Sequence, residues 1–122
     1  MDFNDNQAIY LQIAELLCEN ILTQEWKPGD RIPSVRETAI NMEVNPNTVM
    51  RTFNYLQEKE IIFNKRGIGY FVSEQGYAKT MELKKNDFIH QELPRIFKEM
   101  TLLNMSMKDV EALFEDYQSK NL

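Results

Sequence analysis

The sequence predicts a mainly α-helical fold with one small β-hairpin. Three observations support this fold class. Apolar residues recur at helical spacing in the first half of the chain and again in the last third. Between these regions, two short runs of β-branched and aromatic residues flank a loop that contains glycine. The chain of 122 residues has the length of one ordinary domain.

The N-terminal segment predicts an amphipathic helix. Asn4 or Asp5 can cap its start, and the helix should end near Gln24. Its apolar face consists of Ile9, Tyr10, Ile13, Leu16, Leu17 and Ile21. Residues 27–30, Lys-Pro-Gly-Asp, then predict a turn.

A second, short helix is predicted to begin after Ser34 and to stop near Met42. Ser34 can cap this helix, and Glu37 can accept the N–H of Ser34 in return, which makes a capping box. The residues expected on the inner side of the helix are Val35, Ala39 and Ile40.

A third helix is predicted to follow after a tight turn. Asn45 is a good N-cap, and Pro46 suits the first helical position because its missing N–H costs nothing there. The apolar stripe of this helix is Val49, Phe53 and Leu56. A short helix, a tight turn and a second amphipathic helix form the helix-turn-helix pattern.

The middle of the chain predicts a β-hairpin. Its strands are residues 61–64 and 70–72, and the loop between them is Lys-Arg-Gly-Ile-Gly. A hairpin directly after a helix-turn-helix is a wing, and this wing carries Lys65 and Arg66 at its tip. Residues 1–75 are therefore expected to form a winged helix-turn-helix domain.

Residues 76–122 predict a helical region. One long segment runs from about Tyr77 to Met100, and Pro94 predicts a kink or a restart within it. A last helix should start at Ser106. Two such helices bury little by themselves, so a homodimer is expected. The residues expected in dimer contacts are Met81, Phe88, Phe97, Val110, Leu113, Phe114 and Tyr117.

The charge of the chain is unevenly distributed. The net charge of −5 argues against nucleic acid as a partner. A binding face is local, however, and residues 31–73 carry six cations and four carboxylates, a net charge of +2. Two interpretations stay open: a protein that binds double-stranded DNA, and a winged-helix module for protein–protein interaction that binds no duplex DNA.

Several other functions are not expected. The sequence has no G-x-S-x-G motif, no P-loop and no useful Cys/His pairing, so we expect no enzyme. His90, Asp87 and Glu92 do not make a convincing metal cluster, and no cofactor is predicted. With one cysteine, no signal segment and no membrane span, the expected location is the cytoplasm.

The large aromatic side chains of the N-terminal half are expected in the core. They are Trp26, Phe53, Phe63 and Tyr70. Cys18 is interpreted as a small buried residue of the first helix.

Four pieces of the sequence carry a family resemblance. They are residues 10–14, 28–36, 44–51 and 66–72. Together they cover about the first sixty per cent of the chain, in the order and at the spacing of the family. The chain resembles GntR-type winged-helix transcription factors, and its short C-terminal region resembles the YtrA-like branch.

The resemblance implies positions for the DNA contacts. Ser34 and Arg36 would open the first helix of the motif at the DNA backbone or a base edge. Asn45, Asn47, Thr48 and Arg51 would lie on or beside the recognition helix, and Arg66 and Gly67 would place the wing tip in the minor groove. The full set of predicted DNA-binding residues is Arg31, Ser34, Arg36, Asn45, Asn47, Thr48, Arg51, Lys65, Arg66 and Gly67.

Residue chemistry supports several of these assignments. A helix N-terminus and Arg36 can together bind a phosphate. The carboxamide of Asn47 can pair with adenine at two positions. Arg51 can bind DNA or pair with an acid such as Glu58.

The resemblance also implies a biological role and marks two departures. The family's members of this size are dimeric repressors of their own operons, which often carry transporter genes, and a small-molecule effector is expected by analogy. Glycine is common in the family at the positions of Gln24 and Glu60. We therefore expect local backbone strain at these two helix ends.

Overall fold

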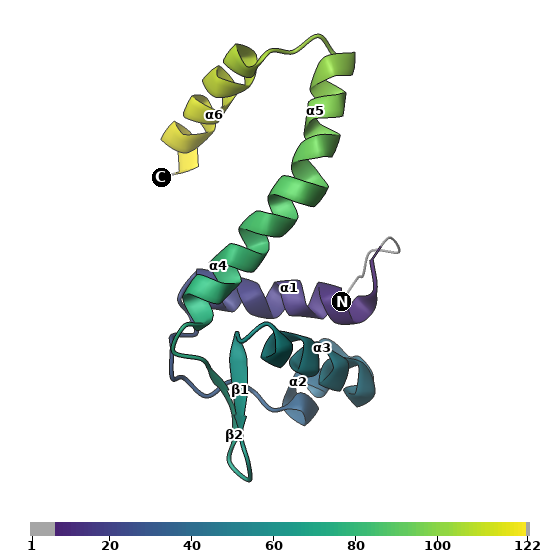
Figure 1. Cartoon of the computed structure of the whole chain (residues 1–122), viewed down its shortest axis with the longest axis vertical. Helices are drawn as coiled ribbons and strands as arrows, with labels where there is room; N and C mark the ends of the chain where they lie inside the picture. Colours follow the sequence, from purple (N-terminus) through teal and green to yellow (C-terminus); the bar gives the residue numbers. More distant parts are fainter. Residues whose placement is uncertain (1–6, 122) are drawn as a thin grey trace. The chain divides into compact units, whose positions relative to one another are not determined.

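The computed structural model describes residues 7–121, and Figure 1 shows the course of the chain. The fold is mainly helical with one antiparallel hairpin, as the sequence predicts. The elements are α1 (Ile9–Leu22), α2 (Val35–Met42), α3 (Pro46–Glu58), β1 (Ile62–Lys65), β2 (Gly69–Val72), α4 (Gly76–Asp87), the π-helical turn η1 (Phe88–Glu92), α5 (Leu93–Leu102) and α6 (Met107–Asn121). Contacts within the chain divide it into two compact units, and the division falls between Leu83 and Lys84.

Helix α3 is the centre of the first unit. It contacts α1, α2 and β1 (Figure 1). The stripe predicted from the sequence is confirmed, because Val49, Phe53 and Leu56 are completely buried. Cys18 of α1 is buried as predicted, and Trp26 and Tyr70 are half-buried against the same core.

Helix α1 begins later than the sequence suggests. Its N-cap is Ala8, which makes no side-chain cap hydrogen bond. The side chain of Gln12 instead reaches back and donates to the carbonyl of Gln7 at 2.7 Å. Asn4 and Asp5, the predicted caps, lie outside the described residues.

Helix α2 begins with the predicted capping box. Glu37 donates its N–H to the hydroxyl of Ser34 at 3.0 Å, and its carboxylate accepts the N–H of Ser34 at 3.1 Å. The prediction for Ile40 is wrong, because its side chain is 69% exposed. The positions that face the core are Thr38 and Ala39, and Ile40 lies about a quarter turn beyond them.

The hairpin pairs β1 with β2 in antiparallel register, with Phe63 opposite Phe71. The segment before α2 adds a short edge, in which Arg31 pairs with Phe71. The prediction that Phe63 belongs to the core is wrong, because its side chain is 38% exposed. Side chains alternate along a strand, so the burial of Ile62 turns Phe63 outward, where it stacks on Phe71.

Two helix ends show the strain expected where family members carry glycine. Gln24 and Glu60 adopt left-handed φ angles of 63° and 62°. After α3, Glu60 donates its N–H to Gln57 and Ile61 donates to Leu56, both at 2.9 Å. This is the Schellman pattern, in which glycine is the usual residue at the left-handed position.

The start of α4 belongs to the first unit. Gly76 and Thr80 are buried there, and Tyr77 and Leu83 pack against the core. The first compact unit therefore continues to Leu83, past the domain boundary expected after residue 75.

The second unit is entirely helical. The interruption predicted at Pro94 is confirmed, because the π-helical turn η1 ends directly before α5 and Pro94 lies in the first turn of α5. Helix α6 starts as predicted, with Ser106 and Asp109 exchanging hydrogen bonds of 2.9 and 3.2 Å. Within residues 7–121, no helix is long and apolar enough to cross a membrane.

Candidate nucleic-acid interface

The N-terminus of α3 is an exposed helix start. The side-chain oxygen of Asn45 accepts the N–H of Asn47 at 2.8 Å and so caps the helix. Pro46 occupies the first turn, Asn47 is exposed and Thr48 is half-buried. The remaining amides of this turn carry the positive end of the helix dipole, which favours an anion such as phosphate.

The N-terminus of α2 carries an exposed cation, Arg36, beside the capping box. Glu37 is the one carboxylate in this first turn. Hydrogen bonds from the backbone and the hydroxyl of Ser34 lower the pKa of Glu37 below its ordinary value, and the charge of Arg31 lowers it further. The negatively charged carboxylate of Glu37 is thus already hydrogen-bonded to the N-cap residue of its own helix.

Arg51 of α3 has a partner that the sequence did not indicate. Its guanidinium carbon lies 4.0 Å from the ring centroid of Tyr10, on α1. The sequence left DNA contact and pairing with an acid open as alternatives for Arg51, and the structure adds a cation–π contact with Tyr10. The only sequence signal was that Tyr10 opens the first of the four family-like pieces.

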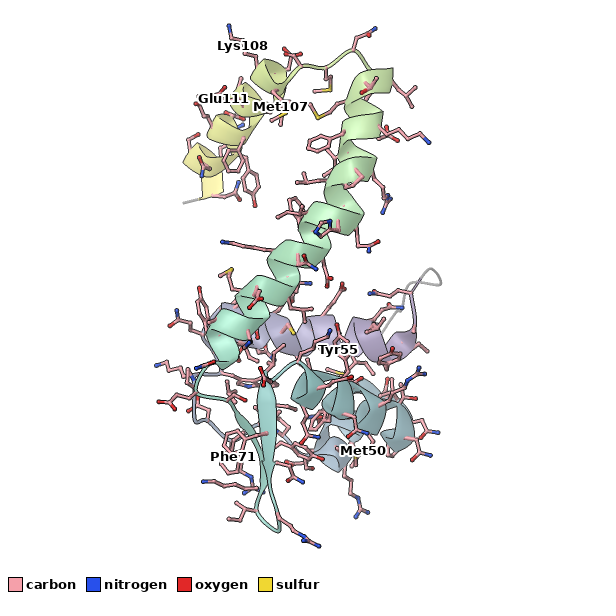
Figure 2. The ribbon with its side chains drawn as sticks, viewed as in Figure 1. Met50, Tyr55, Phe71, Met107, Lys108 and Glu111 are labelled. Carbon is pink, nitrogen blue, oxygen red and sulfur yellow. The ribbon has the colours of Figure 1, made fainter. Side chains whose placement is uncertain are left out.

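The wing tip consists of Arg66, Gly67 and Ile68, all exposed. Gly67 has a φ of 80°, which a turn of this kind requires. Lys65, the other predicted cation, ends β1, and its ammonium lies 5.0 Å from the ring of Phe71 (labelled in Figure 2). Arg66 is therefore the cation at the turn itself, while Lys65 lies back along the strand.

Arg31 lies against the wing. Its guanidinium passes so close to Gly69 that a Cβ on Gly69 would meet the Nε of Arg31 at 2.9 Å. Gly69 also has a φ of 147°, where other residues are strained. The glycine interpreted from sequence as a turn residue thus also makes room for a predicted DNA-binding side chain.

A side-chain contact ties the wing to the recognition helix. The hydroxyl of Tyr70, on β2, lies 3.9 Å from the sulfur of Met50, on α3, at hydrogen-bond geometry (Figure 2 labels Met50). The ring of Tyr70 also packs edge-on against Phe53 at 4.7 Å between centroids. These two contacts join the wing to α3, and sequence reasoning missed Tyr70 as the residue that makes them.

The structure places all ten predicted DNA-binding residues on three neighbouring elements. Arg51 lies in the second turn of α3, and the others lie at the starts of α2 and α3, on the hairpin, or in the segment that pairs with the hairpin. Only Ser34 and Thr48 are half-buried, and the other eight are exposed. Among residues 7–121, no group of three or more His, Cys, Asp or Glu is arranged to hold a metal ion.

The predicted dimer residues mostly belong to the second unit. Met81 lies in the first unit and is half-buried. Val110 of α6, in the second unit, is also half-buried. The exposed members of the set are Phe88, Phe97, Leu113, Phe114 and Tyr117.

A comparison with protein families identifies the first unit. The family profile described as "Bacterial regulatory proteins, gntR family" matches residues 9–72, from the first residue of α1 to the last of β2. This chain belongs to the GntR family. It is therefore a DNA-binding transcriptional regulator with a winged helix-turn-helix.

Individual GntR relatives extend the likeness into the second unit. The transcriptional regulator YhcF of Bacillus subtilis is 34% identical over 108 residues, which cover 88% of each chain. The transcriptional repressor YtrA of the same species is 38% identical over 84 residues, 69% of this chain and 65% of its own. A GntR-family regulator from Bacteroides thetaiotaomicron superposes with a TM-score of 0.78 at 40% identity, over 94% of this chain and 100% of its own.

Proposed function

We propose that this GntR regulator is a homodimeric repressor of its own operon, which we expect to carry transporter genes, and that it binds an inverted-repeat operator. The N-terminal turn of α3 enters the major groove, and the wing tip enters the adjacent minor groove. The observation that carries the proposal is the attachment of the wing to α3 through Tyr70. Because the hairpin contacts α3, the wing with its cations Lys65 and Arg66 lies beside the helix proposed to enter the major groove.

The proposed contacts divide by chemistry. Arg36 and the start of α2 bind backbone phosphate, and Arg31 and Lys65 add cations along the wing. Asn47 reads a base edge in the major groove, and Arg66 enters the minor groove, where a narrow A·T-rich segment attracts arginine.

The second unit supports the homodimer. None of residues 84–121 is buried, although α5 and α6 carry large apolar side chains. Exposed apolar side chains in such number mark an interaction surface. A second copy of the chain is the proposed partner, because an inverted repeat is read by two copies related by a two-fold axis. The relative YtrA is named a repressor.

A small-molecule effector would act through the same helical region. It would have to bind two dimer geometries with different affinities, and so change the spacing of the two winged domains. A thermal-shift screen with metabolites and metal ions tests this part. A screen in which no compound raises the melting temperature argues against an effector.

Fluorescence anisotropy tests DNA binding directly. A labelled duplex from the protein's own upstream region is titrated with the full chain, and a scrambled duplex serves as the control. With about six phosphate contacts, affinity should fall roughly a thousandfold or more between about 50 and about 200 mM salt. Equal binding to the two duplexes, or affinity that does not change with salt, contradicts the proposal.

A matched pair of variants locates the interface. Arg36→Ala removes a predicted phosphate contact and should weaken binding and make the salt dependence shallower by about one counterion. Lys59→Ala removes an exposed cation at the C-terminal end of α3, away from the proposed interface. It should leave the affinity for DNA and its salt dependence unchanged. Circular dichroism of Arg36→Ala should match that of the wild type, since the side chain is exposed.

A further inference from the structure

We propose that Tyr10, a residue of α1 outside the helix-turn-helix, is a positioning residue that sets the pose of Arg51 for DNA contact. The inference rests on the proposed function, in which the exposed side of α3 faces DNA. It assigns a role in recognition to a helix that otherwise only completes the core.

The contact leaves the binding groups of Arg51 available. The guanidinium carbon lies 4.0 Å from the centroid of the Tyr10 ring, and Arg51 is exposed. A cation over an aromatic face is attracted by the electrons of the ring. The N–H donors of a guanidinium lie in its plane and point away from its faces. A ring against the guanidinium carbon therefore restrains the group, while the exposed side chain keeps donors for a phosphate or a guanine.

Tyr10 itself is fixed to α3 by two further contacts. The hydroxyl of Thr52 donates to the carbonyl oxygen of Tyr10 at 2.7 Å, and Thr52 is completely buried. The ring of Tyr55 (labelled in Figure 2) meets the ring of Tyr10 edge-on, with centroids 6.2 Å apart. Residues next to Arg51 and one turn beyond it thus set the position of the ring on which Arg51 rests.

This arrangement has a consequence for affinity. A free arginine side chain loses many rotamers when it binds, whereas one already held on a ring loses fewer. An exposed cation–π contact corresponds to about a three- to fivefold effect on an equilibrium constant. Lysine cannot replace Arg51, because its ammonium is a point charge on a flexible stem without a planar set of donors.

The test is a double-mutant cycle on DNA binding by the full chain. The operator duplex is titrated at one salt concentration with the wild type, Tyr10→Phe, Tyr10→Leu, Arg51→Ala and the Tyr10→Leu/Arg51→Ala double variant. We expect Tyr10→Phe to bind as the wild type, because the ring remains. Tyr10→Leu should bind about three- to fivefold more weakly. The double variant should bind as weakly as Arg51→Ala alone, because the ring has nothing left to position.

A measurement without DNA separates positioning from packing. In the NMR spectrum of the free protein, the side-chain protons of Arg51 should be shifted upfield by the Tyr10 ring. The shift should persist in Tyr10→Phe and disappear in Tyr10→Leu. If Tyr10→Leu loses helical circular dichroism, Tyr10→Met takes its place in the binding cycle and in the NMR comparison, and the shift in the wild type still tests the contact.

Two results overturn the inference, and they are distinguishable from failure of the proposed function. If Tyr10→Leu weakens binding by the same factor with and without Arg51, Tyr10 acts through α1 packing. If the protons of Arg51 show no ring-current shift in the wild type, the contact does not exist in solution. Absence of wild-type binding to the promoter duplex would instead contradict the proposed function itself.

Discussion

The two compact units use their apolar side chains in opposite ways. The first unit buries Ile13, Phe53 and Leu56 completely around α3. In the second unit, none of residues 84–121 is buried, and Phe114 is 55% exposed. One unit therefore contains a core of its own, whereas the other presents an apolar surface. The comparison separates a unit that has a buried core from a unit whose apolar side chains would be covered in the proposed dimer.

The largest expected effect breaks the core of the first unit. Phe53→Ala removes a fully buried ring that also supports Tyr70 of the wing. It should lower the free energy of unfolding by about 3–5 kcal/mol. Urea denaturation measures this loss. A decrease in the free energy of unfolding of less than about 1 kcal/mol would show that the core is not centred on α3.

The second-largest effect is expected from a charge placed among the exposed apolar side chains of the second unit. Phe114→Glu places a charge on the proposed dimer interface and should weaken the dimer by about thirtyfold or more. Gln118→Glu adds the same charge at another exposed position of α6 and serves as the control. Sedimentation velocity at increasing concentration distinguishes the two. A dimer equally stable in both variants would place the interface elsewhere.

The third prediction tests whether Gly69 leaves the space in which Arg31 lies on the proposed DNA-binding surface. Gly69→Ala should destabilise the fold by about 1–3 kcal/mol through its φ alone. It should also displace Arg31 and make the salt dependence of DNA binding shallower by about one counterion. The control is Gly29→Ala, because Gly29 has a φ of 88° and open space around it, so the variant carries backbone strain without touching Arg31. In an Arg31→Ala background, Gly69→Ala should no longer change the salt dependence.

The fourth prediction concerns Gln24 and Glu60, which have left-handed φ angles at helix ends of the first unit. Gln24→Gly should raise the free energy of unfolding by roughly 0.5–1 kcal/mol, because glycine adopts the left-handed conformation without penalty. Glu60→Gly should gain less, since it also removes an exposed ion pair of 3.3 Å with Lys79. Thermal denaturation compares the two. A destabilised Gln24→Gly would mean that the glutamine side chain stabilises this turn.

The smallest expected effect concerns pH. The pKa of Glu37 is lowered in the fold, so its ionised form stabilises the capping box above the pKa of the unfolded chain. This contribution is lost as the pH falls through the folded pKa. The stability difference between the wild type and Glu37→Gln should therefore narrow from neutral to acidic pH in urea denaturation. A difference that stays constant would show that the charge of Glu37 does not matter.

Local signals in the sequence were sufficient for much of the fold. The capping box of Ser34 and the Asn45-Pro46 helix start depend on residues within three positions of one another. The stripe on α3 follows from helical periodicity alone. The interruption before α5 follows from Pro94, which cannot donate a backbone hydrogen bond.

The errors and omissions share a different cause. Ile40 and Phe63 are apolar, but which face of α2 or β1 is covered depends on distant elements, and that information is not local. The contacts of Tyr10 with Arg51 and of Tyr70 with Met50 join residues far apart in the chain. All the side chains proposed to bind DNA were predicted from the sequence and the family resemblance, whereas the contacts made by the aromatic residues Tyr10 and Tyr70 were not.

The most direct test of the different roles of the two units is the number of chains that bind one operator duplex. Sedimentation of a labelled promoter duplex with the full chain should give two chains per duplex. The Phe114→Glu variant should bind the same duplex much more weakly, although its winged helix is intact. One chain per duplex, with equal affinity for the wild type and Phe114→Glu, would contradict the account.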